Sequence, residues 1–269
     1  MTTARDLDER FRTGAQKYAA YLETPEGRLR TDAAFANLQE FLPSLRAERP
    51  SHVLDLGCGT GAIGIRLARL GYRVSLLDSS EAMLDIARHA AEDAGVADRV
   101  TIHHGDVSEL ANLPATCFDV ITCHNVLEFV GNPEVVVQVC ARALRDQSAL
   151  LSLVVRNQAG EVLKAALGSG DLAGAEANLT AEWGYESLYG EQVRLFTSDA
   201  LSALLKAEAL TAFAERGIRI VADYLPSNVS REEQYEQILG LEKRLSRRPD
   251  FARVARHLHV LARLQEARA

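Results

Sequence analysis

A glycine-rich turn stands directly after a short apolar run, in residues 53–61, which read VLDLGCGTG. Sequence with the apolar spacing of a helix follows it, so this part of the chain reads as strand, tight turn and helix. Glycine suits such a turn because any Cβ would block the close approach of a ligand to the backbone. This order favours a βαβ unit with a binding site at the turn.

The same alternation of short apolar runs and longer amphipathic stretches continues for about a hundred residues, which is typical of an open, doubly wound parallel sheet. Strands are expected at His52–Asp55, Arg73–Asp78, Val100–His104, Phe118–Cys123 and Ala149–Val155. Helices are expected between them, near Gly61–Leu70, Ser80–Ala94 and Pro133–Leu144.

The flanking sequence predicts the rest of the architecture. Two helices joined by a turn at Thr24–Gly27 are expected before the sheet, and Asn157–Tyr189 interrupts the alternation as an insertion. After it we expect a helix at Thr197–Glu208, a strand at Leu210–Tyr224 broken at Gly217, a helix at Ser230–Arg247 and a strand at His257–Arg263. The prediction is therefore an α/β fold with a seven-stranded, mostly parallel sheet. It divides into an N-terminal helical cap (1–49), a core (50–156), a helical insertion or lid (157–196) and a C-terminal part that completes the sheet (197–269).

Composition limits the classes of protein that remain. A chain of 269 residues with 47% hydrophobic residues and 25% charged residues is neither disordered nor collagenous. No apolar run approaches the roughly 18 residues that cross a bilayer, and the N-terminus lacks the apolar stretch of a signal peptide. Four cysteines without CxxC spacing fit a reduced, cytoplasmic protein. No His, Cys, Asp or Glu set has metal-ligand spacing, so no metal is expected.

Acidic residues at the ends of successive strands indicate what the glycine turn binds. Asp78, followed by Ser79, lies about 20 residues beyond the turn, where a carboxylate can meet a pair of ribose hydroxyls. Asp106 follows the third strand and can meet an adenine amino group. The glycines also satisfy Gly59-x-Gly61-x-x-Gly64, a dinucleotide pattern. Asp55 argues against that alternative, because a carboxylate repels a pyrophosphate and is suited to accept hydrogen bonds from an ammonium or from the surrounding backbone.

Together with Phe118-Asp119 and the stretch from His124 to Pro133, these motifs resemble those of the class I S-adenosylmethionine-dependent methyltransferases over residues 50–156. The resemblance implies that the cofactor is S-adenosyl-L-methionine. It implies that Arg30 holds the methionine carboxylate, that Asp78 and Ser79 meet the ribose, and that Asp106 and Val107 meet the adenine. The turn would supply backbone contacts through Asp55, Gly57, Cys58, Gly59 and Gly61, and His124 would lie beside the sulfonium.

Shorter motifs outside the core, among them Gly27-x-Leu29-Arg30 and Gly217-Ile218-Arg219, are similar to the bacterial tRNA methyltransferases that esterify 5-carboxymethoxyuridine at the wobble position. This resemblance implies a carboxylate acceptor, held by His124, Arg219 and Tyr224 as catalytic residues. Residues 231–269 hold 9 basic and 6 acidic side chains, so an Arg-rich helix at residues 243–256 is the candidate tRNA contact. Residues 171–191 contain no Lys or Arg.

Two other functions stay open from the sequence alone, because a fold and a cofactor site do not specify the second substrate. The same enzyme could act on a small acidic metabolite, or convert S-adenosylmethionine itself by cyclisation. A protein of another class could bind S-adenosylmethionine or tRNA without turnover. If the acceptor is a phenol, amine or hydroxyl, His124 is the first choice for a general base.

Overall fold

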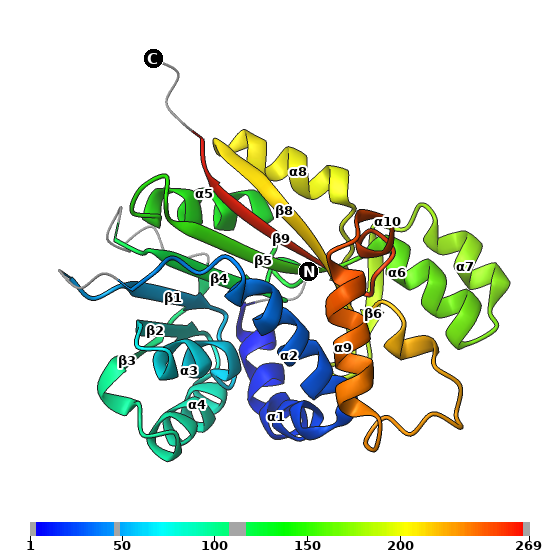
Figure 1. The fold of residues 1–269 in the computed structure, drawn as a ribbon, viewed down its shortest axis with the longest axis horizontal. Helices are drawn as coiled ribbons and strands as arrows, with labels where there is room; N and C mark the ends of the chain where they lie inside the picture. The colour runs from blue at the N-terminus through cyan, green and yellow to red at the C-terminus, as the bar shows by residue number, and fades with distance from the viewer. Residues whose placement is uncertain (1–3, 46–48, 108–116, 266–269) are drawn as a thin grey trace.

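The computed structural model describes residues 4–45, 49–107 and 117–265. Within these residues a sheet of seven strands has the order β3-β2-β1-β4-β5-β9-β8 (Figure 1). β1 to β5 are parallel to one another, whereas β9 pairs antiparallel with both β5 and β8. The predicted fold class is therefore confirmed. The strands are β1 (His52–Leu56), β2 (Arg73–Asp78), β3 (Val100–His104), β4 (Val120–His124), β5 (Leu150–Arg156), β8 (Leu210–Ile218) and β9 (His257–Leu264).

Helices cover both faces of this sheet, and the buried residues divide accordingly into two clusters. One cluster packs α5 and α8 against one face, and the other packs α2, α3, α4 and α9 against the opposite face. The helices are α1 (Ala4–Glu23), α2 (Pro25–Gln39), α3 (Ala62–Arg69), α4 (Glu81–Asp93), α5 (Pro133–Ala143), α8 (Ser198–Ala207), α9 (Tyr235–Ser246) and α10 (Pro249–Ala252). No helix among the described residues is long and apolar enough to cross a membrane.

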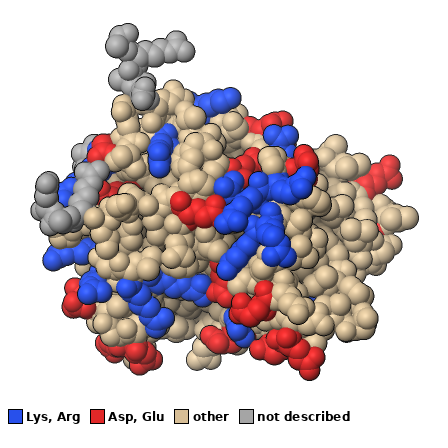
Figure 2. All heavy atoms as spheres, viewed as in Figure 1, with Lys and Arg blue, Asp and Glu red and all other residues tan. Residues whose placement is uncertain are grey.

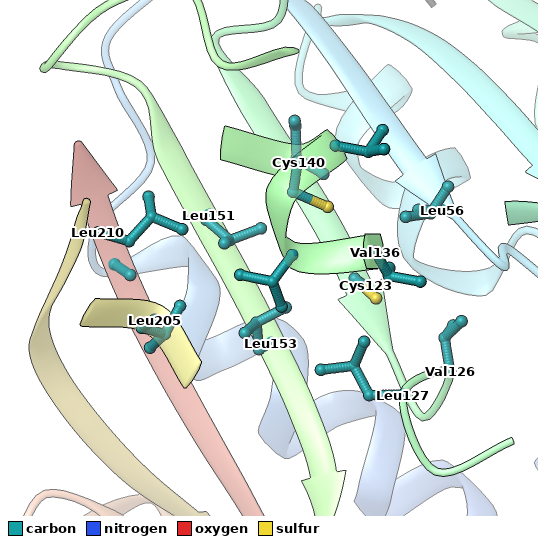
Figure 3. Close-up of a cluster of buried hydrophobic side chains, with 14 of the residues drawn as sticks. Leu56, Cys123, Val126, Leu127, Val136, Cys140, Leu151, Leu153, Leu205 and Leu210 are labelled. Carbon is teal, nitrogen blue, oxygen red and sulfur yellow. The ribbon is translucent and has the colours of Figure 1, made fainter. Parts of the chain in front are cut away.

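Figure 3 shows how one face is filled: Cys123 of β4 and Leu153 of β5 lie opposite Val136 of α5, and Leu205 of α8 closes the cluster beside Leu210. All seven residues of β5 are buried, because β5 lies inside the sheet with helices on both faces. A strand buried on both sides reads as a continuous apolar run rather than as an alternation. This is why the sequence located the core strands well.

Two expected elements differ from the structure. The strand expected at Leu210–Tyr224 ends at Ile218, because Arg219 has a positive φ of 59° and turns the chain into a short 3₁₀ helix at Ala222–Tyr224. The helix expected at Ser230–Arg247 begins only at Tyr235. Ser230 does accept a hydrogen bond from the Glu233 N–H (3.2 Å), but in a turn before the helix.

The insertion after β5 contains helices and also a small hairpin. It consists of α6 (Gln158–Leu163), a π-helical turn (Lys164–Gly168), α7 (Leu172–Asn178), β6 (Trp183–Glu186) and β7 (Glu191–Arg194), the last two pairing antiparallel. The buried Asn157 caps α6 and donates hydrogen bonds to the carbonyls of Arg253 (2.9 Å) and Ala255 (2.7 Å). The insertion is thereby attached to the segment that precedes β9.

Candidate functional site

A cavity of about 740 Å³ lies at the carboxyl ends of the parallel strands, which is where open α/β sheets bind ligands. Its wall includes Gly57 after β1, Asp78 at the end of β2, Asp106 after β3 and His124 at the end of β4. α1 and α2 contribute Tyr18, Tyr21 and Arg30, and the insertion contributes Glu186 and Tyr189. Segments distant in sequence therefore form one site.

The glycine turn forms the floor of one end of the cavity. Gly57 has a φ of 65°, and a Cβ there would lie 2.3 Å from the Val126 Cγ2. The Gly59 N–H donates to Asp78 Oδ2 (2.8 Å), and Asp78 Oδ1 accepts from the Ser80 N–H (2.9 Å). Burial raises the pKa of Asp78, while these backbone donors oppose the rise. Asp78 thus joins the turn to the end of β2.

Three residues expected at the turn do not line the cavity: Asp55, Cys58 and Gly61. Asp55 lies buried beneath the turn, where Oδ2 accepts from the Gly64 N–H (2.9 Å) and Oδ1 from the Thr122 hydroxyl (2.6 Å). Burial raises the pKa of Asp55 to about 6. Both of its oxygens therefore hold β1, α3 and β4 together, and the structure does not place its carboxylate against a ligand ammonium.

Arg30 is a cation with no described carboxylate within ion-pair distance. Its Nη2 donates to the Tyr18 hydroxyl (2.8 Å), and its guanidinium lies 5.5 Å and 5.1 Å from the ring centroids of Tyr18 and Tyr21. Gly27 permits this arrangement, because a Cβ there would lie 2.0 Å from the Tyr21 carbonyl oxygen where α1 turns into α2. The uncompensated guanidinium on the cavity wall makes Arg30 a candidate anion ligand.

The other end of the cavity holds a buried network of ions. Arg156, the last residue of β5, contacts Glu161 (2.6 Å) and Glu186 (2.5 Å). Arg256 also contacts Glu161 (2.6 Å). Burial alone would raise the pKa of Glu161, but Arg256 and Arg156 hold it below its ordinary value. Lys164 lies on the same wall, where burial and the positive charge of Arg256 lower its pKa.

Arg219, one of the residues expected in the site, lies on this wall, and its position depends on the turn after β8. Its guanidinium contacts Asp223 (2.6 Å) and donates to the Tyr21 hydroxyl (3.1 Å). The turn is held from below by the buried Glu242 of α9, which accepts from the N–H groups of Ile220, Val221 and Ala222 at 2.8–3.0 Å. A residue far from the cavity therefore fixes the orientation of Arg219.

His124 and Glu128 add buried polar groups between the two ends. His124 Nε2 hydrogen-bonds to the Ser152 hydroxyl (2.8 Å), and burial together with Arg30 lowers the pKa of His124 to about 3. Glu128 is 4% exposed and accepts from the Asn125 amide (2.9 Å). Burial raises the pKa of Glu128 to about 7. Neutral forms of both side chains are therefore accessible at neutral pH.

Tyr224 is not part of the cavity wall, although the sequence resemblance assigned it a catalytic role. It belongs to the 3₁₀ turn, and its hydroxyl is buried with no hydrogen-bond partner among the described residues. Burial raises the pKa of Tyr224 to about 12. The other expected cavity residues, among them Ser79 and Val107, do line it.

The Arg-rich segment at residues 243–256 is not one helix. α9 ends at Ser246, α10 covers Pro249–Ala252, and Arg256 is buried in the cavity wall rather than exposed. Lys243 and Arg244 in the last turn of α9, with Arg247 and Arg248 after it, form what we call the basic patch. Figure 2 shows Lys and Arg side chains gathered on the face over α9 and α10. Arg247 is paired with Glu40 (2.6 Å).

The sequence did not single out several cavity residues. Arg156 carried a signal, because it is the one charged residue of a fully buried strand. Glu186 and Tyr189 carried none, since the insertion brings them to the cavity through tertiary contacts. Asp223 belongs, with Tyr224, to a short motif of the tRNA methyltransferase resemblance, but that resemblance gave it no role. Among the described residues, no group of His, Cys, Asp and Glu could hold a metal ion.

Comparisons with known proteins agree with this arrangement. Residues 53–147 match a family model described as a methyltransferase domain. The chain is 29% identical to the tRNA 5-carboxymethoxyuridine methyltransferase of Escherichia coli O157:H7, over 97% of this chain and 98% of that protein. It is 32% identical to a ubiquinone biosynthesis O-methyltransferase of Hahella chejuensis, over 54% of this chain and 60% of that protein. The CcbJ methyltransferase of Streptomyces caelestis has the same fold, with a TM-score of 0.61 at 18% identity, over 96% of this chain and 99% of that chain.

Proposed function

The chain belongs to the class I S-adenosylmethionine-dependent methyltransferases, and on that basis we propose that it methylates a carboxylate, with the 5-carboxymethoxyuridine of tRNA as the favoured acceptor. The observation that carries the proposal is the excess of positive charge at the end of the cavity away from the glycine turn. The product would be a methyl ester.

The glycine-turn end of the cavity fits S-adenosylmethionine. Val126 fills the place where a Cβ of Gly57 would lie, so the turn requires glycine at this position, and both residues line the cavity. Asp78 would bind the ribose hydroxyls, and Asp106 with Val107 would border the adenine. Arg30 would pair with the methionine carboxylate. That carboxylate would supply the negative charge that no described residue places within ion-pair distance of Arg30.

The charge at the opposite end supports an anionic acceptor. Four cationic side chains gather there, from Arg156, Lys164, Arg219 and Arg256. Three carboxylates pair with them, from Glu161, Glu186 and Asp223. While Glu128 is neutral, one positive charge is left over, and a single carboxylate would compensate it. Because buried ions require partners, an acceptor with one negative charge fits this wall better than a neutral one.

A carboxylate acceptor also fits the available chemistry. When bound, S-adenosylmethionine would supply a methyl group on a sulfonium for in-line displacement, in which the S–CH3 bond breaks and a neutral thioether, a good leaving group, departs. A carboxylate is already ionised at neutral pH, so no side chain has to remove a proton from it. The protein's part is to hold the carboxylate through Arg219 and its neighbours, to orient it, and to exclude water.

Two further observations support tRNA as the source of that carboxylate. Two relatives that align over nearly the full length of both chains are named for this acceptor. The basic patch supplies cations that can meet phosphates outside the cavity.

A tRNA substrate would place the protein in the cytoplasm, as expected from the sequence. A small acidic metabolite is the second candidate, since the charge of the wall selects the carboxylate and not the molecule that bears it.

Transfer of a radiolabelled methyl group tests the proposal. Purified protein is incubated with labelled S-adenosylmethionine and either tRNA that contains 5-carboxymethoxyuridine or a small-molecule extract. We expect label in tRNA that mild alkali releases, because an ester hydrolyses readily. Label in small molecules alone would transfer the activity to a metabolite. Bound cofactor without label in either acceptor would contradict the proposal.

A further inference from the structure

Three buried polar side chains form a continuous hydrogen-bonded chain across the sheet beneath the cavity. His124 of β4, Ser152 of β5 and His259 of β9 come from three adjacent strands. The Ser152 hydroxyl lies 2.8 Å from His124 Nε2 and 2.8 Å from His259 Nε2. The two rings are 5.2 Å apart at 73°. Ser152 and His259 are 0% exposed, whereas His124 belongs to the cavity wall.

The hydroxyl in the middle has one proton and two lone pairs. The two imidazoles are its hydrogen-bond partners among the described residues, so its proton is used only when it donates to one ring and accepts from the other, which gives two directions. In the first, His124 Nε2–H donates to Ser152, and Ser152 donates to His259. In the second, His259 Nε2–H donates to Ser152, and Ser152 donates to His124. The direction decides the tautomer of both imidazoles, because the nitrogen that accepts leaves the proton on Nδ1 of the same ring.

The surroundings of His259 favour the second direction. His259 Nδ1 is buried and has no hydrogen-bond partner among the described residues. The first direction would place a proton there and create a buried N–H without an acceptor, and such groups are rarer than acceptors that lack a donor. The second direction leaves only a lone pair at His259. Its N–H without a partner is instead at Nδ1 of His124, which is buried as well but belongs to a residue of the cavity wall, where a bound ligand can supply the acceptor that His259 lacks.

We infer that Ser152 and His259 are positioning residues that hold His124 as a neutral imidazole protonated on Nδ1, so that a ligand meets a hydrogen-bond donor there. Nε2 of His124 is already bonded to Ser152, so Nδ1 is the ring nitrogen that remains for a ligand. The donor would bind a carboxylate oxygen of the acceptor. A phenol, amine or hydroxyl that needs a base would find no lone pair at this nitrogen. The inference deepens the proposed function and rests on it for the identity of the bound oxygen.

Nitrogen-15 NMR of the full-length, ligand-free protein tests the tautomer without any turnover. With labelled histidine, assigned through bonds to the backbone, we expect His124 to show a protonated, pyrrole-type Nδ1 and an unprotonated, pyridine-type Nε2. His259 should show the opposite pattern. A protonated Nε2 on His124 would overturn the inference, whatever the acceptor proves to be.

Removal of the bridge tests whether Ser152 sets the tautomer. In Ser152→Ala the His124 signals should lose their preference for Nδ1–H, while an unchanged pattern would show that the bridge does not set it. Ser246→Ala is the matched control, because it removes another buried hydroxyl. Ser246 is the last residue of α9, and its hydroxyl donates to Asn37 of α2. This variant should leave the His124 signals as they are. If Ser152→Ala fails to fold, Ser152→Cys, which bonds weakly, replaces it, and the wild-type spectrum still decides the assignment.

The kinetic consequence separates this inference from the acceptor assignment. Ser152→Ala should lower kcat about tenfold on whichever carboxylate the protein methylates, with cofactor affinity unchanged, since one oriented hydrogen bond is lost. His259→Leu should lower kcat as Ser152→Ala does. His259→Gln should lower it less, because the glutamine amide N–H can still donate to Ser152. Equal losses in both His259 variants would contradict the relay. If the NMR pattern is the expected one but the protein does not methylate tRNA, only the proposed function is overturned.

Discussion

Asp78 shows how much a single side chain contributes at the glycine turn, since one oxygen fixes Gly59 and the other fixes Ser80. We expect Asp78→Asn to weaken S-adenosylmethionine binding by about 1–3 kcal/mol, the range for a hydrogen bond to a charged group. Isothermal titration calorimetry measures it. Asp85→Asn, an exposed carboxylate on the adjoining α4, should bind the cofactor as wild type does. Equal affinity in all three proteins would remove Asp78 from the cofactor site.

Glu128 should make acceptor binding depend on pH. Its pKa is raised to about 7 by burial, so the carboxyl is neutral below that pH and gains a negative charge above it. A negative charge on the cavity wall repels a carboxylate acceptor, and KM should therefore rise as the pH increases through about 7. Initial rates across this range measure the effect. Glu128→Gln should give a flat KM, and a profile identical to that of the wild type would assign the dependence elsewhere.

At the scale of elements, the sequence predicted what local pattern determines. β2 (Arg73–Asp78) and β3 (Val100–His104) have the expected bounds because an apolar run with a polar end marks each strand. The hairpin of β6 and β7 was not predicted, because its strands hold Trp183, Glu186 and Glu191 without apolar alternation. Its contact with the core depends on Glu186, which pairs with Arg156 30 residues earlier. A pairing of that kind leaves no local signal.

The turn after β8 illustrates the same limit and gives a test. Arg219 was predicted, but Glu242, which binds three N–H groups of the turn, was not, because the two are joined only in the folded chain. Glu242→Ala should lower the free energy of unfolding by about 2–5 kcal/mol, since buried donors lose their acceptor. Urea denaturation measures it. Glu236→Ala, at an exposed position of α9, should change the value by less than about 0.5 kcal/mol. Equal free energies of unfolding for the Glu242→Ala and Glu236→Ala variants would show that other contacts hold the turn.

At the scale of the whole molecule, a chain of net charge -7 binds an anion through local concentrations of positive charge. The sequence indicated the basic C-terminal region correctly, but not that Arg256 leaves the basic patch to enter the cavity. Burial of Arg256 depends on Asn157 and Glu161, which the insertion brings to the segment before β9.

The basic patch should act on tRNA affinity and not on the cofactor. We expect Lys243→Ala with Arg244→Ala to weaken tRNA binding and to reduce the slope of log K against log salt by about 2, because two phosphate contacts are lost. Filter binding at several salt concentrations measures this slope. Arg88→Ala, an exposed arginine on α4, is the control. An unchanged slope in the double variant would place the tRNA contact on another surface.

The central claim is that the acceptor atom is a carboxylate oxygen. The most direct measurement is single-turnover methyl transfer to two anticodon stem-loops that differ only at the wobble base, one with 5-carboxymethoxyuridine and one with its neutral carboxamide. The account predicts one alkali-labile methyl group per molecule on the first and none on the second. Methylation of both at similar rates, or of a position other than the carboxylate, would contradict it.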